Sequence, residues 1–251
     1  MNEASPIMEF RRVGKRFGRV RALDGVDLAV RPGELVALLG SPGAGTSTMV
    51  KLAAALVRPD QGQVALFGRD LRTAGRDLFG RIGFVFEEPD LDARLTVGGH
   101  LRYRAGMMGF GRSDARMLTA RALAVVGLAE RAEDRAGVLP DSSRRRLALG
   151  RAALGAPALI VADRYADGLD PDDRSTVLEP LLRLRSEGRT AILLATAEPA
   201  VAAATGRVVV LHRGRTAFDG TRDAFVAAGA GDVAAAFASL VRAASEKTAD
   251  T

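Results

Sequence analysis

The chain has 251 residues, of which 47% are hydrophobic and 26% charged, and its formal net charge is +6. This composition predicts one soluble globular domain with room for an inserted subdomain, and the absence of cysteine excludes disulfides and cysteine-ligated zinc. The chain has only two histidines, His100 and His212, which argues against a histidine-rich metal site. Its arginines are scattered and only 5% of its residues are aromatic, which argues against nucleic-acid binding.

The start of the chain also bears on location. Residues 1–6 lack the basic and then apolar pattern of a signal peptide. No apolar run in the sequence reaches the length of a membrane span. We therefore expect a cytoplasmic protein.

The first third of the chain predicts short strands around one glycine-rich loop. Weak alternation at 7–12 predicts an edge strand, and the continuous apolar run at 35–39 is typical of a strand buried on both faces. Residues 46–56, rich in Ala and Leu, predict a helix that stops before Pro59. The ranges predicted as strands are 7–12, 26–30, 35–39, 63–68 and 82–86.

The pattern becomes helical between about residues 88 and 150, which predicts an inserted helical subdomain, and strands then return at 159–163 and 190–196. Strands that alternate with helices predict an α/β fold, with a mostly parallel sheet flanked by helices. Further predicted elements are helices at 95–107, 113–126, 172–186 and 222–245, a hairpin at 208–218 and a frayed tail at 246–251.

The loop Gly40-Ser41-Pro42-Gly43-Ala44-Gly45-Thr46-Ser47-Thr48 has the glycine spacing of a phosphate-binding P-loop, G-x-x-x-x-G-K-[ST]. Thr46 stands where the lysine belongs. The loop lies between a predicted strand and a predicted helix, which is the context that a P-loop requires. Its backbone N–H groups and the helix N-terminus therefore favour an anion even without the lysine ammonium.

With these segments in this order, the chain resembles the ATP-binding subunit of ABC transporters along nearly its whole length. The resemblance implies a P-loop NTPase-type fold with an N-terminal antiparallel β region and one nucleotide-binding domain at 1–251. That domain would include the helical subdomain at 88–150 and a C-terminal helical extension at 222–245. The segments that carry the resemblance are 40–48, 82–89, 139–149, 158–163, 168–171, 196–197 and the exporter-like tail at 231–237.

The departures from the family pattern fall on its catalytic positions. Thr46 replaces the P-loop lysine, Glu87 the metal-contacting glutamine, Arg164 the glutamate that polarises water, and Ala197 the switch histidine. The resemblance therefore implies that hydrolysis is lost or strongly impaired. The family's LSGGQ signature is altered as well, and it reads Leu139, Pro140, Asp141, Ser142 and Ser143 here.

Several positions of the nucleotide site survive. The resemblance implies that Ser47 and Asp163 would hold Mg²⁺ if a nucleotide binds, that Asp170 belongs to the D-loop, and that Phe17 lies where an aromatic ring stacks on adenine. Without the lysine, ATP and Mg²⁺ are expected to bind weakly or not at all. The implied nucleotide-binding residues are Phe17, Gly40, Ser41, Gly43, Ala44, Gly45, Thr46, Ser47 and Thr48.

The sequence leaves alternatives open at five features. Phe17 stacks on a base or packs in the core, and Glu87 and Arg164 pair across the empty site or point to solvent. Asp141 is favoured as a helix cap and would also repel a partner's phosphate. The arginines at 144–146 are expected on a solvated helix face, and residues 107–110 line a groove for a membrane subunit or belong to the core.

The function that this pattern favours is that of a catalytically degenerate subunit of an ABC transporter complex, with a structural or regulatory role. The implied partners are membrane-spanning permease subunits and a second nucleotide-binding subunit, identical or different, which would place the chain on the inner face of the membrane. The alternatives are a slow ATPase that powers export and a soluble interaction module outside transport. No nucleic-acid partner is expected.

Overall fold

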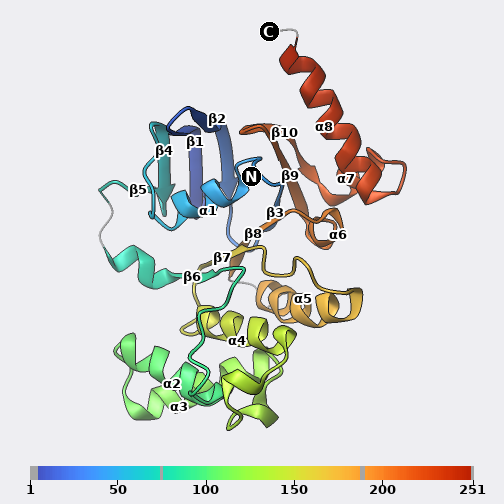
Figure 1. Cartoon of the computed structure of the whole chain (residues 1–251). Helices are drawn as coiled ribbons and strands as arrows, with labels where there is room; N and C mark the ends of the chain where they lie inside the picture. Colours follow the sequence, from blue (N-terminus) through green and yellow to red (C-terminus); the bar gives the residue numbers. More distant parts are fainter. Residues whose placement is uncertain (1–4, 74–75, 187–189, 250–251) are drawn as a thin grey trace.

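The computed structural model describes residues 5–73, 76–186 and 190–249. Two sheets and a group of helices make up the molecule, as Figure 1 shows. The antiparallel sheet lies beside a larger, mostly parallel sheet, and the helices α2, α3 and α4 lie together at the opposite end. The predicted α/β architecture with an N-terminal antiparallel region is confirmed.

The smaller sheet is antiparallel, with the order β2-β1-β4-β5. Met8 of β1 pairs with Val30 on one side and with Leu66 on the other, so β1 is an inner strand and the prediction of an edge strand is wrong. Its alternation reflects a sheet that is buried on one face only. The four strands are β1 (Met8–Phe17), β2 (Val20–Val30), β4 (Gln61–Leu66) and β5 (Arg69–Asp70).

The larger sheet has the order β10-β9-β3-β8-β7-β6, and its strands are parallel except for β10. Every residue of β3 and β8 is buried, as the apolar runs predict. The carboxyl ends of the parallel strands meet at one edge, where ligands of α/β proteins bind. The strands are β3 (Leu35–Leu39), β6 (Ile82–Val85), β7 (Leu159–Asp163), β8 (Ala191–Thr196), β9 (Arg207–His212) and β10 (Arg215–Thr221).

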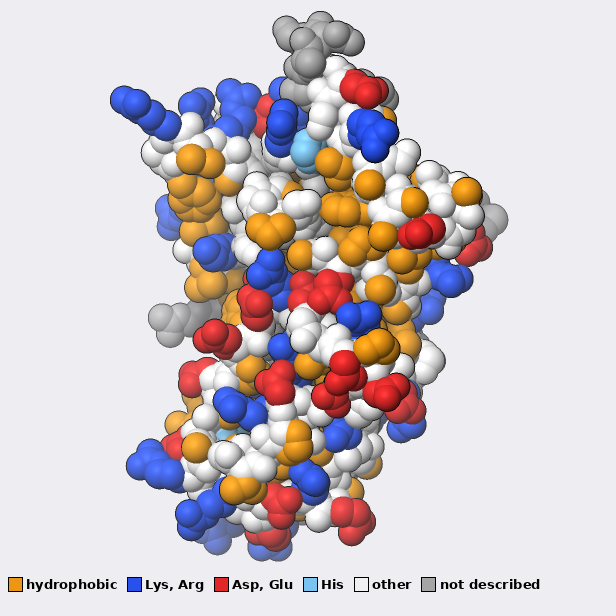
Figure 2. Space-filling model, turned by 45° about the vertical axis from the view of Figure 1, so that its right-hand side comes forward, with side chains coloured by type: hydrophobic (Ala, Val, Ile, Leu, Met, Phe, Trp, Pro, Cys, Tyr) orange, Lys and Arg blue, Asp and Glu red, His pale blue; other side chains and the backbone are white. Residues whose placement is uncertain are grey.

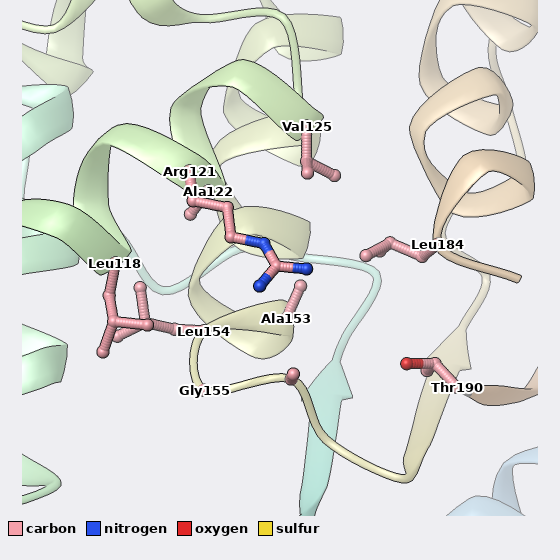
Figure 3. Close-up of a pocket in the computed structure, with 10 residues that line it drawn as sticks. Leu118, Arg121, Ala122, Val125, Ala153, Leu154, Gly155, Leu184 and Thr190 are labelled. Atoms are coloured by element: carbon pink, nitrogen blue, oxygen red, sulfur yellow. The ribbon is translucent and has the colours of Figure 1, made fainter. Parts of the chain in front are cut away.

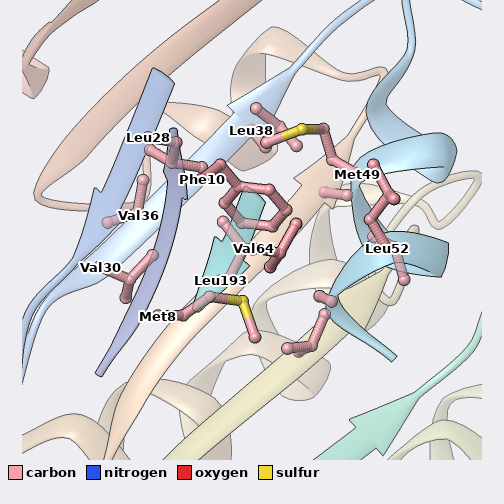
Figure 4. Close-up of a cluster of buried hydrophobic side chains, with 14 of the residues drawn as sticks. Met8, Phe10, Leu28, Val30, Val36, Leu38, Met49, Leu52, Val64 and Leu193 are labelled. Carbon is pink, nitrogen blue, oxygen red and sulfur yellow. The ribbon is translucent and has the colours of Figure 1, made fainter. Parts of the chain in front are cut away.

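The core between the two sheets contains α1 (Thr46–Ala53). Phe10 and Val64 of the antiparallel sheet, Leu38 and Leu193 of the parallel sheet, and Met49 of α1 belong to one buried cluster (Figure 4). Each of these side chains is at most 2% exposed. The helix that follows the glycine-rich loop is therefore fixed by packing on both of its neighbours.

The helical part contains α2 (Val97–Met107), α3 (Arg112–Val125) and α4 (Asp141–Ala153), with short 3₁₀ turns at η1 (Arg76–Arg81), η2 (Ala129–Arg131) and η3 (Ala136–Val138). The helix α4 also packs on strand β6. A Cβ atom on Gly83 would lie 2.3 Å from the carbonyl oxygen of Ala152, so this approach requires glycine. The packing of α4 on β6 ties the helical part to the sheet edge.

Four helices complete the fold: α5 (Pro171–Ser186), α6 (Pro199–Ala202), α7 (Arg222–Ala227) and α8 (Val233–Ala249). The segment predicted as one helical stretch is two helices, because Asp232 caps α8 by accepting hydrogen bonds from Ala234 and Ala235. Contrary to the prediction of a frayed tail, α8 extends to Ala249, and residues 250–251 lie outside the described part.

The described helices include none that is both long and apolar enough to cross a membrane. Charge on the surface is uneven. A group of acidic side chains crosses the middle of the face shown in Figure 2, and many Lys and Arg side chains lie above and below it. The net positive charge of the chain is therefore not a property of every surface.

Candidate nucleotide site

The glycine-rich loop joins β3 to α1, as the sequence predicts. Gly40 donates its N–H to the carbonyl of Thr196, which fixes the start of the loop against β8. Gly43 and Gly45 have φ angles of 85° and 110°, which side chains other than glycine rarely adopt. A Cβ atom on Gly45 would also lie 2.6 Å from the carbonyl oxygen of Ala22. The glycines of this loop are therefore needed for its positive φ angles and for the close approach of Gly45 to Ala22.

The backbone N–H groups at the start of α1 are open. Within the described residues, no acceptor is found for the N–H groups of Gly43, Gly45, Thr46, Ser47 and Thr48. The N-cap Gly45 provides no side-chain acceptor, and the first turn contains no acidic residue. Such an N-terminus attracts an anion through its free donors and its dipole. Thr46 adds no charge to it.

Asp163 ends β7 next to this loop. Burial raises the pKa of its carboxyl group, and the nearby carboxylates of Glu87 and Asp167 act in the same direction, whereas Arg164 and a hydrogen bond with Ser47 lower it. The buried Oδ1 atom of Asp163 has no hydrogen-bond partner within the described residues. An unpaired carboxylate oxygen beside a serine hydroxyl fits the ligands that Mg²⁺ takes in proteins.

Glu87 and Arg164 form an ion pair at the ends of β6 and β7. The Nη1 atom of Arg164 lies 3.4 Å from Oε1 of Glu87, so of the two alternatives that the sequence left open, the structure shows the pair. The side chain of Arg164 is 31% exposed and that of Glu87 is 50% exposed. Arg164 has a φ angle of 50°, and its N–H donates to the carbonyl of Ala195 on β8.

Asp167 connects the loop after β7 to the end of β8. Its carboxylate accepts hydrogen bonds from the hydroxyl of Thr196 and, at 2.8 Å, from the N–H of Ala197. Burial raises the pKa of Asp167, and these two hydrogen bonds partly offset that effect. Sequence reasoning missed this residue, because a contact across 30 positions leaves no local pattern.

Glu198 makes a second connection at the same place. Its Oε1 atom accepts the N–H of Gly168 at 2.6 Å, and its Oε2 atom accepts from Arg174 of α5 at 2.7 Å. Asp170 accepts the N–H groups of Asp172 and Asp173, so it caps the start of α5. The loop after β7 is therefore fixed to both β8 and α5, and sequence reasoning missed Glu198 and Arg174 as well.

Asp141 does not cap α4 with its side chain. Pro140 occupies the N-cap position without a side-chain hydrogen bond, and the carboxylate of Asp141 accepts from Nε of Arg145 at 2.8 Å. The cap prediction is wrong, because the carboxylate lies one position too far along the helix. Ser142 and Ser143 are 7% and 4% exposed, and Leu139 is buried too.

The arginines at 144–146 are half-buried rather than on a solvated helix face, which corrects the prediction for these residues. Arg145 is 12% exposed, and its Nη1 atom donates to the carbonyls of Arg164, Tyr165 and Asp167. Arg146 donates to the carbonyl of Val126 after α3. The basic run therefore joins α4 to the loop after β7 and to α3.

The structure also bears on the alternatives that the sequence left open for Phe17 and for the segment 107–110. Phe17 is 46% exposed with Lys15 over its ring, so the alternative that it packs in the core is wrong. Met107 is 65% exposed, whereas Met108 packs against the core of the helical part. Met108 therefore fits the core interpretation, and the groove for a membrane subunit stays a prediction.

A separate cavity of about 120 Å³ lies among α3, the segment after α4 and the start of β8 (Figure 3). Its walls are mostly apolar, with Arg121 and Thr190 as polar exceptions. It shares no residue with the glycine-rich loop or the ends of β6 and β7. The cavity is therefore distinct from the candidate nucleotide site.

Comparison with known protein families gives a decisive match. The family model described as ABC transporter matches residues 23–165, which is more than half of the chain. This chain belongs to the ABC transporter family. The ABC match includes both the glycine-rich loop and Asp163, the residues that the structure brings together at the sheet edge.

Named relatives of this ABC protein include importers and exporters. A methionine import ATP-binding protein of Leifsonia xyli is 35% identical over 85% of this chain and 65% of its own length. A lipoprotein-releasing ATP-binding protein of Rhodospirillum rubrum is 36% identical over 78% of this chain and 89% of its own length. A macrolide export ATP-binding/permease protein of Hyphomonas neptunium is 32% identical, and this chain spans 34% of it. The chain thus spans less than two thirds of two of these relatives, and the exporter-like branch stays a prediction.

Solved structures show the same ABC fold. An ATP-binding subunit of an ABC transporter has a TM-score of 0.79 with 26% identity, covering 93% of this chain and 99% of that one. CbiO1 from Clostridium perfringens has a TM-score of 0.82 with 22% identity, over 89% of this chain and 91% of that one. A dimeric ATP-binding cassette bound to ADP and Pi has a TM-score of 0.74 with 24% identity, over 86% and 98%.

Proposed function

We propose that this chain is a catalytically degenerate ATP-binding subunit of an ABC transporter complex. It binds MgATP weakly or not at all, pairs with a second nucleotide-binding subunit, and has a structural or regulatory role in coupling to membrane permease subunits. It would work in the cytoplasm, on the inner face of the membrane. The whole of 1–251 would act as one nucleotide-binding domain, with the helical subdomain at 88–150 and the extension at 222–245.

The observation that carries this proposal is the ion pair between Glu87 and Arg164 beside Asp163. Hydrolysis requires a group that accepts a proton from water or orients it against the terminal phosphate. A guanidinium is always protonated and has no acceptor, and the methyl group of Ala197 offers neither a donor nor an acceptor. Arg164 and Ala197, which stand at the family's water-activating positions, thus cannot activate water.

The energetic consequence is large. Loss of one preorganised donor typically raises a barrier by roughly 3 kcal/mol, which lowers the rate by a factor of about 100. The losses of the lysine, glutamate and histidine are not additive, because such groups act as a unit. Together these losses are expected to leave turnover nearly abolished.

Two of the residues expected to hold the metal are present, although Glu87 replaces the metal-contacting glutamine. Ser47 and Asp163 would hold Mg²⁺ with a bound nucleotide, and the ion would supply positive charge to the phosphates. The presence of Ser47 beside the unpaired Oδ1 atom of Asp163 favours the alternative of a slow ATPase. That alternative requires another group to orient water, and the groups that lie near Asp163 are Glu87 and Asp167, both already engaged.

The partner's site would be affected as well. The resemblance to the family implies that the signature helix of one subunit faces the nucleotide bound by the other subunit. Here that helix is α4, and its first residue is Asp141 with a side chain that is 57% exposed. A carboxylate at this position repels a phosphate instead of donating to it. The subunit would therefore weaken hydrolysis in the partner rather than promote it.

The test is Mg²⁺-dependent ATP hydrolysis together with calorimetric titration of MgATP. We expect wild type to hydrolyse ATP at background rate, and Thr46→Lys to tighten MgATP binding about tenfold by restoring one charge. Thr46→Met, of similar length but uncharged, is the matched control and should leave affinity unchanged. Turnover in wild type that Asp163→Asn abolishes would establish the slow ATPase instead.

A further inference from the structure

A cavity of about 350 Å³ lies between the end of α2 and the start of α3, at the opposite end of the molecule from the antiparallel sheet (Figure 1). It shares no lining residue with the cavity of Figure 3 or with the candidate nucleotide site. Arginines make up half of its described lining. The lining residues are Arg102, Gly106, Phe110, Arg112, Ala115 and Arg116.

The arginines of α3 at this cavity carry charge that the protein does not neutralise. Arg112 and Arg116 are exposed, and neither has an ion pair in the described part of the chain. Asp114 lies two positions from each of them, and residues at that spacing do not face each other on a helix. On the opposite wall, Arg102 lies 4.0 Å from Glu133, whose side chain is 81% exposed, so this pair is weak. The cavity is therefore positively charged.

The wall formed by α2 is open because it contains a glycine. A Cβ atom on Gly106 would have no neighbour within 4 Å, so packing does not require glycine here. Glycine inside a helix costs roughly 1 kcal/mol relative to alanine. The opposite wall has only the methyl group of Ala115 between its two arginines. The space is far larger than the roughly 15 Å³ that one water molecule needs, so it admits a ligand group.

Apolar side chains lie next to this cavity. Tyr103 and Met107 are each 65% exposed, and their i,i+4 spacing places them on one face of α2. Each directly follows a residue of the cavity wall, so the apolar face adjoins the cavity. The exposed ring of Phe110 lines the cavity itself. Arginines beside exposed aromatic and methionine side chains are typical of protein surfaces that enter the headgroup region of a membrane.

We propose that the end of α2 and the start of α3 bind an anionic lipid surface, with a lipid phosphate in the cavity beside Arg112 and Arg116. Guanidinium groups donate to phosphate oxygens in pairs, and anionic lipids attract such side chains. Tyr103 and Met107 would enter the boundary between headgroups and acyl chains. This contact goes beyond the proposed function, in which permease subunits alone connect the chain to the membrane, and it does not depend on nucleotide binding.

The competing occupant is an acidic protein segment. Its carboxylates would pair with the same arginines, but Tyr103 and Met107 would stay in water unless the segment also covered that face of α2. The cavity is bounded by two helix ends and the short link between them, so it suits one headgroup better than the length of a helix. A lipid surface meets both requirements, because its phosphates and apolar chains lie side by side.

The test is co-sedimentation of the full chain with lipid vesicles at about 0.1 M salt, where distant charges are screened. We expect binding to vesicles of mixed phosphatidylglycerol and phosphatidylcholine, and none to phosphatidylcholine alone. Arg112→Gln combined with Arg116→Gln should weaken binding about 30-fold, as expected for two arginines at an anionic surface. The matched control combines Arg19→Gln and Arg242→Gln, which remove the same charge from exposed positions elsewhere and should weaken binding less than about threefold.

Two further variants leave the net charge unchanged. Gly106→Gln fills the cavity with a better helix former, so it should weaken vesicle binding at least about threefold without loss of stability. The chain has no tryptophan, so Met107→Trp introduces a single fluorophore whose emission should shift to shorter wavelength when phosphatidylglycerol vesicles are added. Leu56→Trp, at an equally exposed position after α1, is its control and should show no shift.

Equal weakening in the two double variants would overturn the inference, because binding would then reflect net charge alone. Absence of vesicle binding by wild type would overturn it as well. In that case, binding of a poly-glutamate peptide would assign the cavity to an acidic protein segment, and binding of inorganic phosphate would assign it to a soluble phosphate compound. These outcomes leave the proposed function standing, whereas sustained ATP hydrolysis overturns that function and not this inference. Circular dichroism of every variant separates lost binding from misfolding.

Discussion

The loop after β3 and the loop after β7 meet at the same sheet edge but are built differently. The loop at 40–45 depends on glycine conformations and leaves the N–H groups of Gly43 and Gly45 without partners in the described chain. The loop at 164–170 is held by side chains, with Arg145 on three of its carbonyls and Glu198 on Gly168. One loop offers donors to a ligand, and the other satisfies its groups internally.

The difference shows which parts of a site withstand substitution. Backbone donors depend on φ angles and on close approach, so Gly43 and Gly45 preserve them without any help from Thr46. Side-chain chemistry has no such protection, because one replacement such as Arg164 changes both the charge and the hydrogen bonding. Under the proposed function, this cassette would lose its catalytic side chains and keep the backbone donors of its phosphate-binding loop.

The largest effect is expected from Arg145→Ala, which tests whether side chains hold the loop after β7. If the variant were as stable as wild type, the contrast between the two loops would fail. The variant leaves three carbonyl oxygens without their donor and should lower the free energy of unfolding by about 3 kcal/mol. Urea denaturation measures the change. The matched control is Arg183→Ala, an exposed i,i+4 partner of Glu179 on α5, which should cost less than about 1 kcal/mol. Equal losses in the two variants would show that Arg145 is an ordinary surface residue.

A smaller effect of opposite sign is expected from Asp163→Asn. Because burial raises the pKa of Asp163, the native state binds more protons than the unfolded chain between 3.8 and the raised value, so stability falls as the pH rises through that window. The neutral amide removes this cost and should stabilise the protein by about 1 kcal/mol at pH 7. Thermal unfolding at pH 7 and below pH 3.8 tests it, since the advantage should vanish at the lower pH. A destabilised variant at pH 7 would mean that the carboxylate is needed for the fold.

The smallest effect is expected from the pair at the ends of β6 and β7. A double-mutant cycle with Glu87→Gln and Arg164→Gln should give a coupling of about 0.5 kcal/mol, because both side chains are partly exposed. Raising the salt concentration to about 1 M should reduce it, since charges in contact with solvent are screened. A coupling well above about 1 kcal/mol would mean that the pair is a structural element comparable to Arg145.

The parallel strands could be predicted from the sequence, because strands buried on both faces, such as β3 and β8, are continuous apolar runs. The sequence offered the Glu87–Arg164 pair as one of two alternatives, since family positions that face one ligand lie close together, and only the structure decides for the pair. The sequence could not predict the roles of Asp167 and Glu198, whose partners lie 24 to 30 positions away. The error at Asp141 had a local cause, since one residue of register separates a cap from a side-chain pair.

The guanidinium of Arg145 has a mechanical consequence. It extends from α4 into the loop after β7, while the backbone of that loop is held in turn by β8 and α5. Arg145 thereby couples the helical part to the sheet edge, in addition to the packing of α4 on β6. A displacement of α4 by a neighbouring subunit would therefore be transmitted to the loop at 164–170 even when no nucleotide is bound.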